Sequence, residues 1–168
     1  MAELRERLDE ILAPFRPLNV GEGHAAVRAV RNIQTNAKPN PKRLFVAEGF
    51  WLASLALRDG LEVDTLLVSP ECVYTPECVA LIEKTLPLAK NIYTVSEKVF
   101  RKIAEKDKPD GVIAICPMKS WDLSDLSFDD KAVALILDGI EIPGNMGTLV
   151  RVADGAFTAR VDDSGNTK

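Results

Sequence analysis

The first segment of the chain carries apolar residues at the spacing of a helix. Between positions 2 and 13 they fall on one helical face: Leu4, Leu8, Ile11 and Leu12. Pro14 ends this helix, because proline has no amide hydrogen for the hydrogen bond that a helix interior needs. A second helix is predicted over residues 24–34, with loops over residues 20–23 and 36–41.

From residue 44 onward, short apolar runs alternate with amphipathic segments. The apolar runs predict strands over residues 44–47, 63–69, 91–95 and 111–116. The amphipathic segments predict helices over residues 49–58, 76–86 and 96–105, the last of them capped by the Ser96 hydroxyl. Strands that alternate with helices indicate an α/β fold, in which a mostly parallel sheet is covered by helices on both faces.

A polar and acidic stretch separates this region from one further apolar run, over residues 132–137, which predicts a new strand. A loop and a short helical pattern follow, and the last residues are polar enough to predict a disordered end. The pattern thus predicts five parts: an N-terminal helix and loop (1–23), a domain (24–117), a linker (118–131), a second and incomplete unit (132–157) and a tail (158–168).

The composition is that of a folded chain without metal or disulfides. Its 168 residues are 46% apolar and 27% charged, enough for one domain and part of another. Cys72, Cys78 and Cys116 are odd in number and lack metal-ligand spacing, so we expect reduced thiols and a cytoplasmic protein with no metal site. No apolar run approaches the ~20 residues of a membrane span, so no membrane partner is expected.

The strongest candidate for chemistry lies in residues 135–156, LILDGIEIPGNMGTLVRVADGA. The apolar run would deliver Asp138 to the carboxyl edge of a sheet, where α/β proteins usually bind ligands. Asn145 is placed to cap the helix that follows, whose free amides suit a phosphate, and Arg151 could reach back to the same loop. The alternative is an ordinary strand, a Gly/Pro turn and a helix with a solvated arginine.

A second candidate is a basic region within an acidic chain of net charge −4. Residues 24–47 hold five cations and no acidic residue: Arg28, Arg31, Lys38, Lys42 and Arg43. Such a region suits the phosphates of a nucleic acid, although ordinary solvated cations remain the alternative.

A second cluster of charged residues, over residues 98–108, is interleaved with acidic residues and predicts a solvated helix face. Phe50, Trp51 and Trp121 could stack on bases, but packing in a helix or the linker is favoured.

The segment around Asn145 resembles motif 1 of the SpoU-type RNA ribose methyltransferases of the SPOUT superfamily. The family pattern P-x-N-x-G-x-x-x-R is present as Pro143, Asn145, Gly147 and Arg151, and a small-residue run follows. Upstream, residues 45–49 (FVAEG) resemble a signature of the family's N-terminal domain, which is similar to ribosomal protein L30e. Residues 108–114 (KPDGVIA) resemble a second one, with Asp110 where the family often has glutamine.

The resemblance implies an L30e-like α/β/α sandwich, followed by the first strand and helix of an incomplete trefoil-knot domain. It implies methyl transfer from S-adenosylmethionine to a ribose 2′-hydroxyl of structured RNA, ribosomal or transfer, by a homodimer, with no DNA partner. Asn145 and Arg151 would stand at the reacting ribose. A guanidinium has no acceptor and a pKa above ~12, so Arg151 would stabilise the developing alkoxide and position phosphate.

The family builds its cofactor pocket from two later motifs that find no counterpart after residue 156, so we expect this chain not to bind S-adenosylmethionine alone. Two other classes of function remain open. One is a non-catalytic RNA-binding module of the L30e type, which would depend on Lys42 and Arg43 but not on Arg151. The other is a nucleotide- or small-molecule-binding α/β protein, which the lack of a Walker A lysine and of GxGxxG disfavours.

Overall fold

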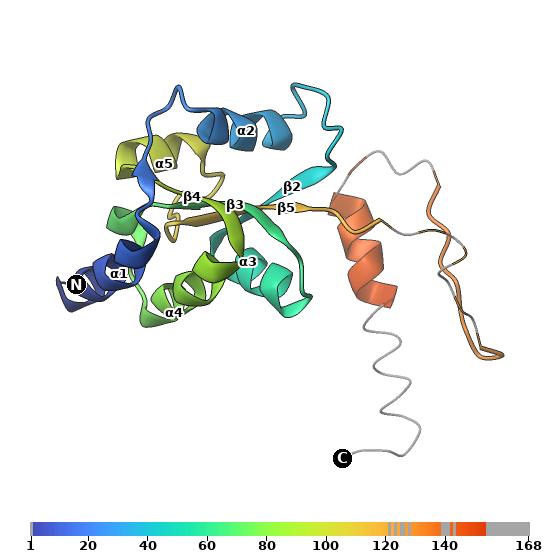
Figure 1. The fold of residues 1–168 in the computed structure, drawn as a ribbon. Coiled ribbons are helices and arrows are strands. Elements are labelled where there is room, and N and C mark those ends of the chain that lie inside the picture. Colours follow the sequence, from blue (N-terminus) through green and yellow to red (C-terminus); the bar gives the residue numbers. More distant parts are fainter. Residues whose placement is uncertain are drawn as a thin grey trace, which may run out of the picture. The chain divides into compact units, whose positions relative to one another are not determined.

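The computed structural model describes residues 2–120, 122, 124, 127, 129–138, 142 and 144–153 (Figure 1). The chain divides into two compact units, Met1–Ser120 and Trp121–Lys168, and each is described by itself. A search of the described residues finds no helix that is both long and apolar enough to cross a membrane.

The first unit is built on one mixed sheet. In the described part of the chain it has five strands: β1 (Leu18–Asn19), β2 (Leu44–Glu48), β3 (Val63–Val68), β4 (Ala89–Thr94) and β5 (Val112–Pro117). The order is β1-β4-β3-β5-β2. β4 pairs in parallel with β1 and β3, whereas β5 is antiparallel to both of its neighbours, β3 and β2. The expected mostly parallel sheet is therefore wrong, because apolar runs do not reveal strand direction.

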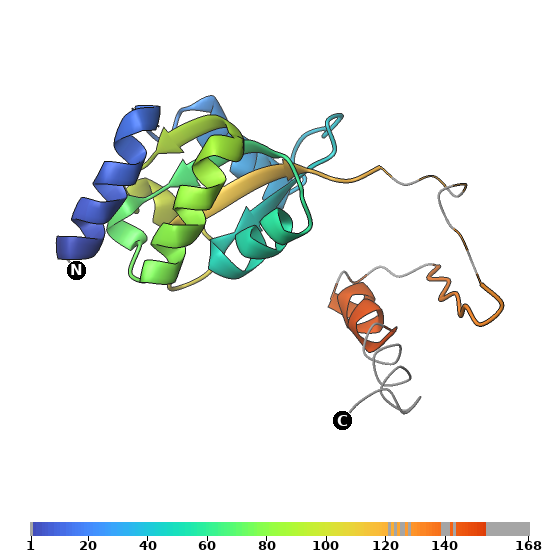
Figure 2. The ribbon, with the colours of Figure 1, turned by 60° about the horizontal axis from the view of Figure 1, so that its bottom comes forward.

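Helices cover both faces of this sheet, as the alternating pattern predicted. Their bounds are α1 (Ala2–Leu12), α2 (Ala25–Gln34), α3 (Gly49–Arg58), α4 (Pro76–Thr85) and α5 (Glu97–Ile103). α2 and α5 lie on one face, and α1, α3 and α4 lie on the other (Figure 1). Figure 2 shows these last three helices side by side, with α4 in the middle. Three short 3₁₀ turns complete the unit: Ala13–Phe15, Pro70–Cys72 and Leu86–Leu88.

The two central strands divide the apolar core between the helical layers. Successive side chains of a strand point to opposite faces. Leu66 and Val68 therefore pack with α1, α3 and α4, while Leu67 between them packs with α2 and α5. Val112, Ala114 and Cys116 alternate in the same way with Ile113 and Ile115. Burial on both faces explains why these strands are continuous apolar runs in the sequence.

Local signals set the ends of the helices. The Ser96 hydroxyl accepts a hydrogen bond from the Val99 amide, which confirms the predicted cap of α5. His24 also caps a helix, since its Nδ1 accepts from the Ala26 amide at 3.3 Å. α1 ends at Leu12, and Pro14 lies in the 3₁₀ turn that follows it. The sequence did not predict β1, which is only two residues long with both side chains exposed.

The second unit has one described helix, over residues 144–153. The strand predicted for residues 132–137 is absent: these residues have no regular secondary structure, and all but the half-buried Leu137 are exposed. An apolar run becomes a strand only beside a neighbour with which it can exchange backbone hydrogen bonds. None of the described residues supplies that neighbour. The predicted tail, 158–168, lies outside the described residues, as do Trp121, Pro143 and the rest of the small-residue run after Ala153.

Candidate nucleic-acid interface

The loop between α2 and β2 is held in shape by Asn40. Its side-chain amide donates to the Leu44 carbonyl at 2.6 Å, and its side-chain oxygen accepts from the Leu44 amide at 2.9 Å. The Asn40 carbonyl accepts from the Arg43 amide at 2.9 Å, which closes a tight turn. Asn40 thus pairs with the first residue of an edge strand, as a neighbouring strand would.

This ordered loop presents three exposed cations: Lys38, Lys42 and Arg43. Within the described residues, none of their side chains has an ion pair or a hydrogen-bond partner. The Arg43 carbonyl accepts from the Met118 amide at 2.8 Å, so the loop is also bound to the segment that follows β5. Unpaired cations on a hydrogen-bonded turn suit a phosphate-binding surface, because no carboxylate competes for them and the backbone that carries them is held.

The other two predicted cations lie on α2 rather than in the loop. Arg28 is exposed and has no ion pair within the described residues. Arg31 donates to the Glu22 carboxylate at 3.0 Å. The hydrogen bond from Lys102 on α5, and then that from Arg31, hold the pKa of Glu22 below its usual range. The structure therefore groups three of the five predicted residues in one loop and places the other two on the adjacent helix.

Asn145 and Arg151 both lie on the helix over residues 144–153 and are exposed. The Arg151 guanidinium donates to the Thr148 hydroxyl at 3.2 Å, and a Cβ at Gly147 would lie 3.3 Å from that guanidinium. Asn145 does not cap the helix as predicted. It lies within the first turn, and its amide donates to the Ile142 carbonyl at 3.0 Å. The predicted strand end at Asp138 is exposed coil.

The two upstream signatures pair along β2 and β5, where Ala47 lies opposite Ala114, and hydrogen bonds link the residues around them, which the sequence did not predict. The Glu48 side chain is buried, and its carboxylate accepts from the backbone amides of Glu105 at 2.8 Å and Lys106 at 3.2 Å. In return, the Asp110 carboxylate accepts from the Phe50 amide at 2.9 Å. These bonds tie the junction of β2 and α3 to the loop before β5. Both carboxylates belong to the two signatures, Glu48 to FVAEG and Asp110 to KPDGV, but sequence alone could not show that these segments lie together in the fold.

The exposure of the aromatic residues corrects one expectation. Trp51 was expected to pack, but 66% of it is exposed on α3. A helix cannot bury its whole circumference, and Gly49, Ala53 and Ala56 form the buried side of α3. Phe50 is half-buried and packs against the core, as expected.

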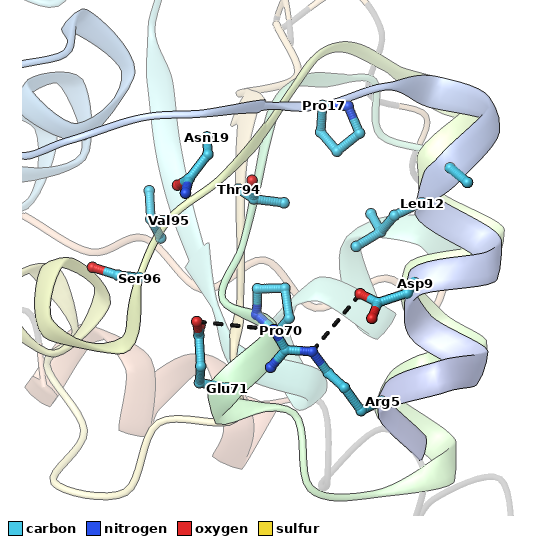
Figure 3. Close-up of a pocket in the computed structure, with 11 residues that line it drawn as sticks. Arg5, Asp9, Leu12, Pro17, Asn19, Pro70, Glu71, Thr94, Val95 and Ser96 are labelled. Carbon is cyan, nitrogen blue, oxygen red and sulfur yellow. Dashed lines mark ion pairs between the residues drawn. The ribbon is translucent and has the colours of Figure 1, made fainter. Parts of the chain in front are cut away.

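A cavity of about 300 Å³ lies beside the carboxyl ends of β1 and β4, at Asn19 and Thr94 (Figure 3). Arg5 points into it between two carboxylates, 3.7 Å from Asp9 and 3.9 Å from Glu71. With two carboxylates against one guanidinium, this cavity does not favour an anionic ligand. A search of the described residues finds no cluster of three metal-ligating side chains.

Comparison with known proteins identifies relatives for this chain. A family model described as "MRM3-like substrate binding domain" matches residues 24–114. The 23S rRNA (guanosine(2553)-2′-O)-methyltransferase RlmP of Bacillus subtilis (strain 168) is 27% identical over 130 residues, which cover 77% of this chain and 47% of that protein.

Solved structures that resemble this chain are RNA methyltransferases as well. A crystal structure of an RNA 2′-O ribose methyltransferase has a TM-score of 0.61 and 28% identity, covering 83% of this chain and 52% of that one. An AdoMet-bound rRNA methyltransferase from Sinorhizobium meliloti has a TM-score of 0.51 and 26% identity, covering 64% and 39%. The chain spans about half the length, or less, of these relatives.

Proposed function

Because the chain belongs to the family of MRM3-like substrate-binding domains, which confirms the resemblance drawn from its motifs, we propose that residues 1–120 bind structured RNA. We further propose that the complete protein transfers a methyl group from S-adenosylmethionine to a ribose 2′-hydroxyl of ribosomal RNA. The relatives support this reaction, since the matched B. subtilis and solved proteins carry 2′-O-methyltransferase names.

The observation that carries RNA binding is the loop around Asn40. Its cations are exposed, unpaired within the described residues and held on an ordered backbone. A binding surface that is already ordered loses less conformational entropy when the ligand arrives. Contacts to phosphates supply the salt-dependent part of RNA affinity. Transfer RNA is a second candidate substrate, but the name of the B. subtilis relative favours ribosomal RNA.

For catalysis, we assign the helix over residues 144–153 to the reacting ribose. S-adenosylmethionine would supply an electrophilic methyl group. The described residues of this unit do not enclose a site for it, because all of them are exposed except the half-buried Leu137 and Gly147. We therefore propose that this chain alone does not bind the cofactor. Arg151, with a guanidinium that cannot accept a proton, would stabilise negative charge on the 2′-oxygen or hold a phosphate.

Two proposals concern the surroundings of the complete protein. Large apolar side chains are exposed in the second unit, including Ile136 at 87% and Val133 at 81%, and they support a homodimer or further polypeptide that covers them. The three free, buried cysteines support a reducing compartment such as the cytoplasm.

RNA binding is tested by titrating the chain with fragments of 23S ribosomal RNA at several salt concentrations. The double variant Lys42→Gln/Arg43→Gln should bind more weakly, and the slope of log K against log salt should fall by about 1.5, as for two lost phosphate contacts. Lys84→Gln is the control for the loss of one exposed cation elsewhere, since Lys84 lies on α4 without an ion pair in the described residues. An unchanged slope in the double variant would remove the loop from the RNA interface.

The methyl-transfer proposal is tested in the complete protein, with ribosomal RNA and labelled S-adenosylmethionine. Arg151→Ala should abolish label transfer while RNA affinity stays within a factor of about two. Full methylation by this variant would favour the non-catalytic alternative for these residues.

A further inference from the structure

Glu22 joins two cations that come from different helices. Its Oε1 lies 3.0 Å from the Arg31 guanidinium on α2, and its Oε2 lies 2.6 Å from the Lys102 ammonium on α5. Each carboxylate oxygen therefore binds one cation, and the two cations converge on one anionic group. All three side chains are partly exposed, at 38% for Arg31, 46% for Lys102 and 44% for Glu22, so RNA can reach this place.

The backbones that carry the two cations are held by contacts other than those with Glu22. α2 and α5 lie next to each other on one face of the sheet (Figure 1). The Gln34 side chain donates to the Ile103 carbonyl at 3.0 Å and links the two helices. Val30 and Phe100 are both completely buried in the core beneath them. Packing and this hydrogen bond thus hold the backbones that carry Arg31 and Lys102 next to each other whether or not the carboxylate is bound.

Glu22 itself stands between two glycines whose presence the observed conformation does not explain. A Cβ added to Gly21 or to Gly23 would meet no atom within 4 Å, and neither residue has a positive φ. Any residue would therefore fit the conformation seen here. Glycine also allows many other backbone conformations. The loop is anchored on both sides, because the Val20 amide donates to the Thr94 carbonyl at 2.8 Å and the His24 ring contacts Tyr93. The tip between these anchors, which carries Glu22, is a turn closed by a hydrogen bond from the His24 amide to the Gly21 carbonyl at 3.0 Å.

We propose that Arg31 and Lys102 form a subsite for a backbone phosphate of RNA, and that Glu22 occupies it until RNA displaces the carboxylate. The inference rests on the proposed RNA-binding function and extends the interface from the loop around Asn40 onto the surface of α2 and α5. A phosphodiester, like a carboxylate, presents two anionic oxygens to a pair of cations. In this proposal the exchange opens the Gly21-Glu22-Gly23 turn, whose two glycines allow other backbone conformations once the hydrogen bond from His24 to Gly21 breaks.

The first experiment compares RNA affinities of Glu22→Gln and wild type, with the same ribosomal RNA fragments. Loss of the competing charge should tighten binding by roughly three- to tenfold, the scale of two exposed ion pairs. Glu83→Gln is the matched control: Glu83 pairs with Arg7 at 2.8 Å on the α1 and α4 side, so the variant makes the same change in net charge. Its affinity should change less than about twofold. If Glu22→Gln and Glu83→Gln gain equally in RNA affinity, the effect is one of net charge, and the proposed subsite is overturned.

The second experiment identifies the cations and the loop tip. Arg31→Gln and Lys102→Gln should each lower the slope of log K against log salt by about 0.7–0.9, and either should cancel the gain of Glu22→Gln. Gly21→Ala/Gly23→Ala restricts the tip and should weaken RNA binding when Glu22 is present, but not in the Glu22→Gln background. Weakening of equal size in both backgrounds would rule out the proposed displacement.

A third arm separates RNA phosphate from free phosphate. At constant ionic strength, the gain of Glu22→Gln should appear in RNA affinity; tighter binding of millimolar inorganic phosphate by this variant without any gain in RNA affinity would assign the subsite to free phosphate and overturn the RNA assignment. Wild-type protein that binds no RNA at all would contradict the proposed function as well. Wild-type binding that depends on Lys42 and Arg43 but not on Arg31, Lys102 or Glu22 would overturn the subsite alone.

Discussion

The carboxylate of Asp110 accepts a hydrogen bond from the backbone amide of Phe50 at 2.9 Å, across 60 residues of sequence. Asp110 thereby caps the N-terminus of α3, where backbone amides lack partners and a negative charge is favourable. Glu48, two residues before Phe50, binds the amides of Glu105 and Lys106 in the opposite direction. The two carboxylates thus link the β2–α3 junction to the loop before β5 by three hydrogen bonds.

Removal of the Glu48 carboxylate should destabilise the first unit strongly. Glu48→Ala leaves the amides of Glu105 and Lys106 without their acceptor, and hydrogen bonds to charged groups contribute about 1.5–3 kcal/mol each. We expect a loss of about 3 kcal/mol in the free energy of unfolding, measured by urea titration. Glu62→Ala is the control, because Glu62 forms only an exposed pair with Lys90 and should contribute less than about 1 kcal/mol. Equal effects of the two substitutions would contradict this role.

Gly49 should not tolerate alanine. Its φ is +83°, and a Cβ there would overlap the Lys106 ammonium and lie 2.6 Å from an Asp110 carboxylate oxygen. Gly49→Ala combines a left-handed backbone strain of about 1–2 kcal/mol with displacement of the carboxylate that caps α3. Thermal unfolding should report a lower melting temperature. Adding Lys106→Ala should recover part of the loss, because it removes one clash and leaves the strain. No recovery would place the effect in the backbone strain and the contact with Asp110.

The sequence predicted the elements of the first unit well, since their signals are local. The predicted bounds of α3 are those observed, because apolar spacing and the turn residues around 59–60 act within a few residues. The layers also followed from the sequence, since central strands such as β3 are apolar on both faces. The direction of β5 did not, because it depends on which strands become its neighbours.

The candidate site was predicted less completely. The cations of residues 24–43 could be found by counting charge, but Arg31 lies against Glu22, which falls just outside that window. Lys102 was assigned to a solvated helix face because acidic residues surround it in sequence, whereas α2 adjoins it in space. The strand at 132–137 was predicted from apolar content alone, and strand formation also requires a partner. In each case the prediction differs from the structure because the outcome depends on contacts between segments that are distant in sequence.

Alkaline pH should destabilise the fold through Cys78. Burial raises the pKa of its thiol from 9.0 to about 12, and the charge of Asp110 adds to the shift. Between these values the folded state keeps a proton that the unfolded state has lost, so stability is fully present below pH 9 and falls as pH rises toward 12. The loss should reach at most about 1.4 kcal/mol per pH unit. In Cys78→Ser, urea titrations above pH 9 should show a shallower decline. If the free energy of unfolding falls equally steeply with pH in Cys78→Ser and in wild type, the Cys78 thiol is not the cause of the alkaline destabilisation.

The loop around Asn40 offers a test in which no charge is changed. Asn40→Ala removes both side-chain hydrogen bonds to Leu44 while Lys38, Lys42 and Arg43 stay in place. If the ordered backbone positions these cations for phosphate, RNA affinity should fall by roughly three- to tenfold, because each ordered side chain or loop segment costs about 0.5–1.5 kcal/mol on binding. The salt slope should stay nearly constant, since the number of available cations is unchanged. Asn32→Ala, on the adjacent helix α2 and without a side-chain hydrogen bond within the described residues, is the control. A lower slope of log K against log salt in Asn40→Ala would show instead that the substitution removes phosphate contacts. Unchanged RNA affinity of this variant would mean that the order of the loop does not contribute to RNA binding.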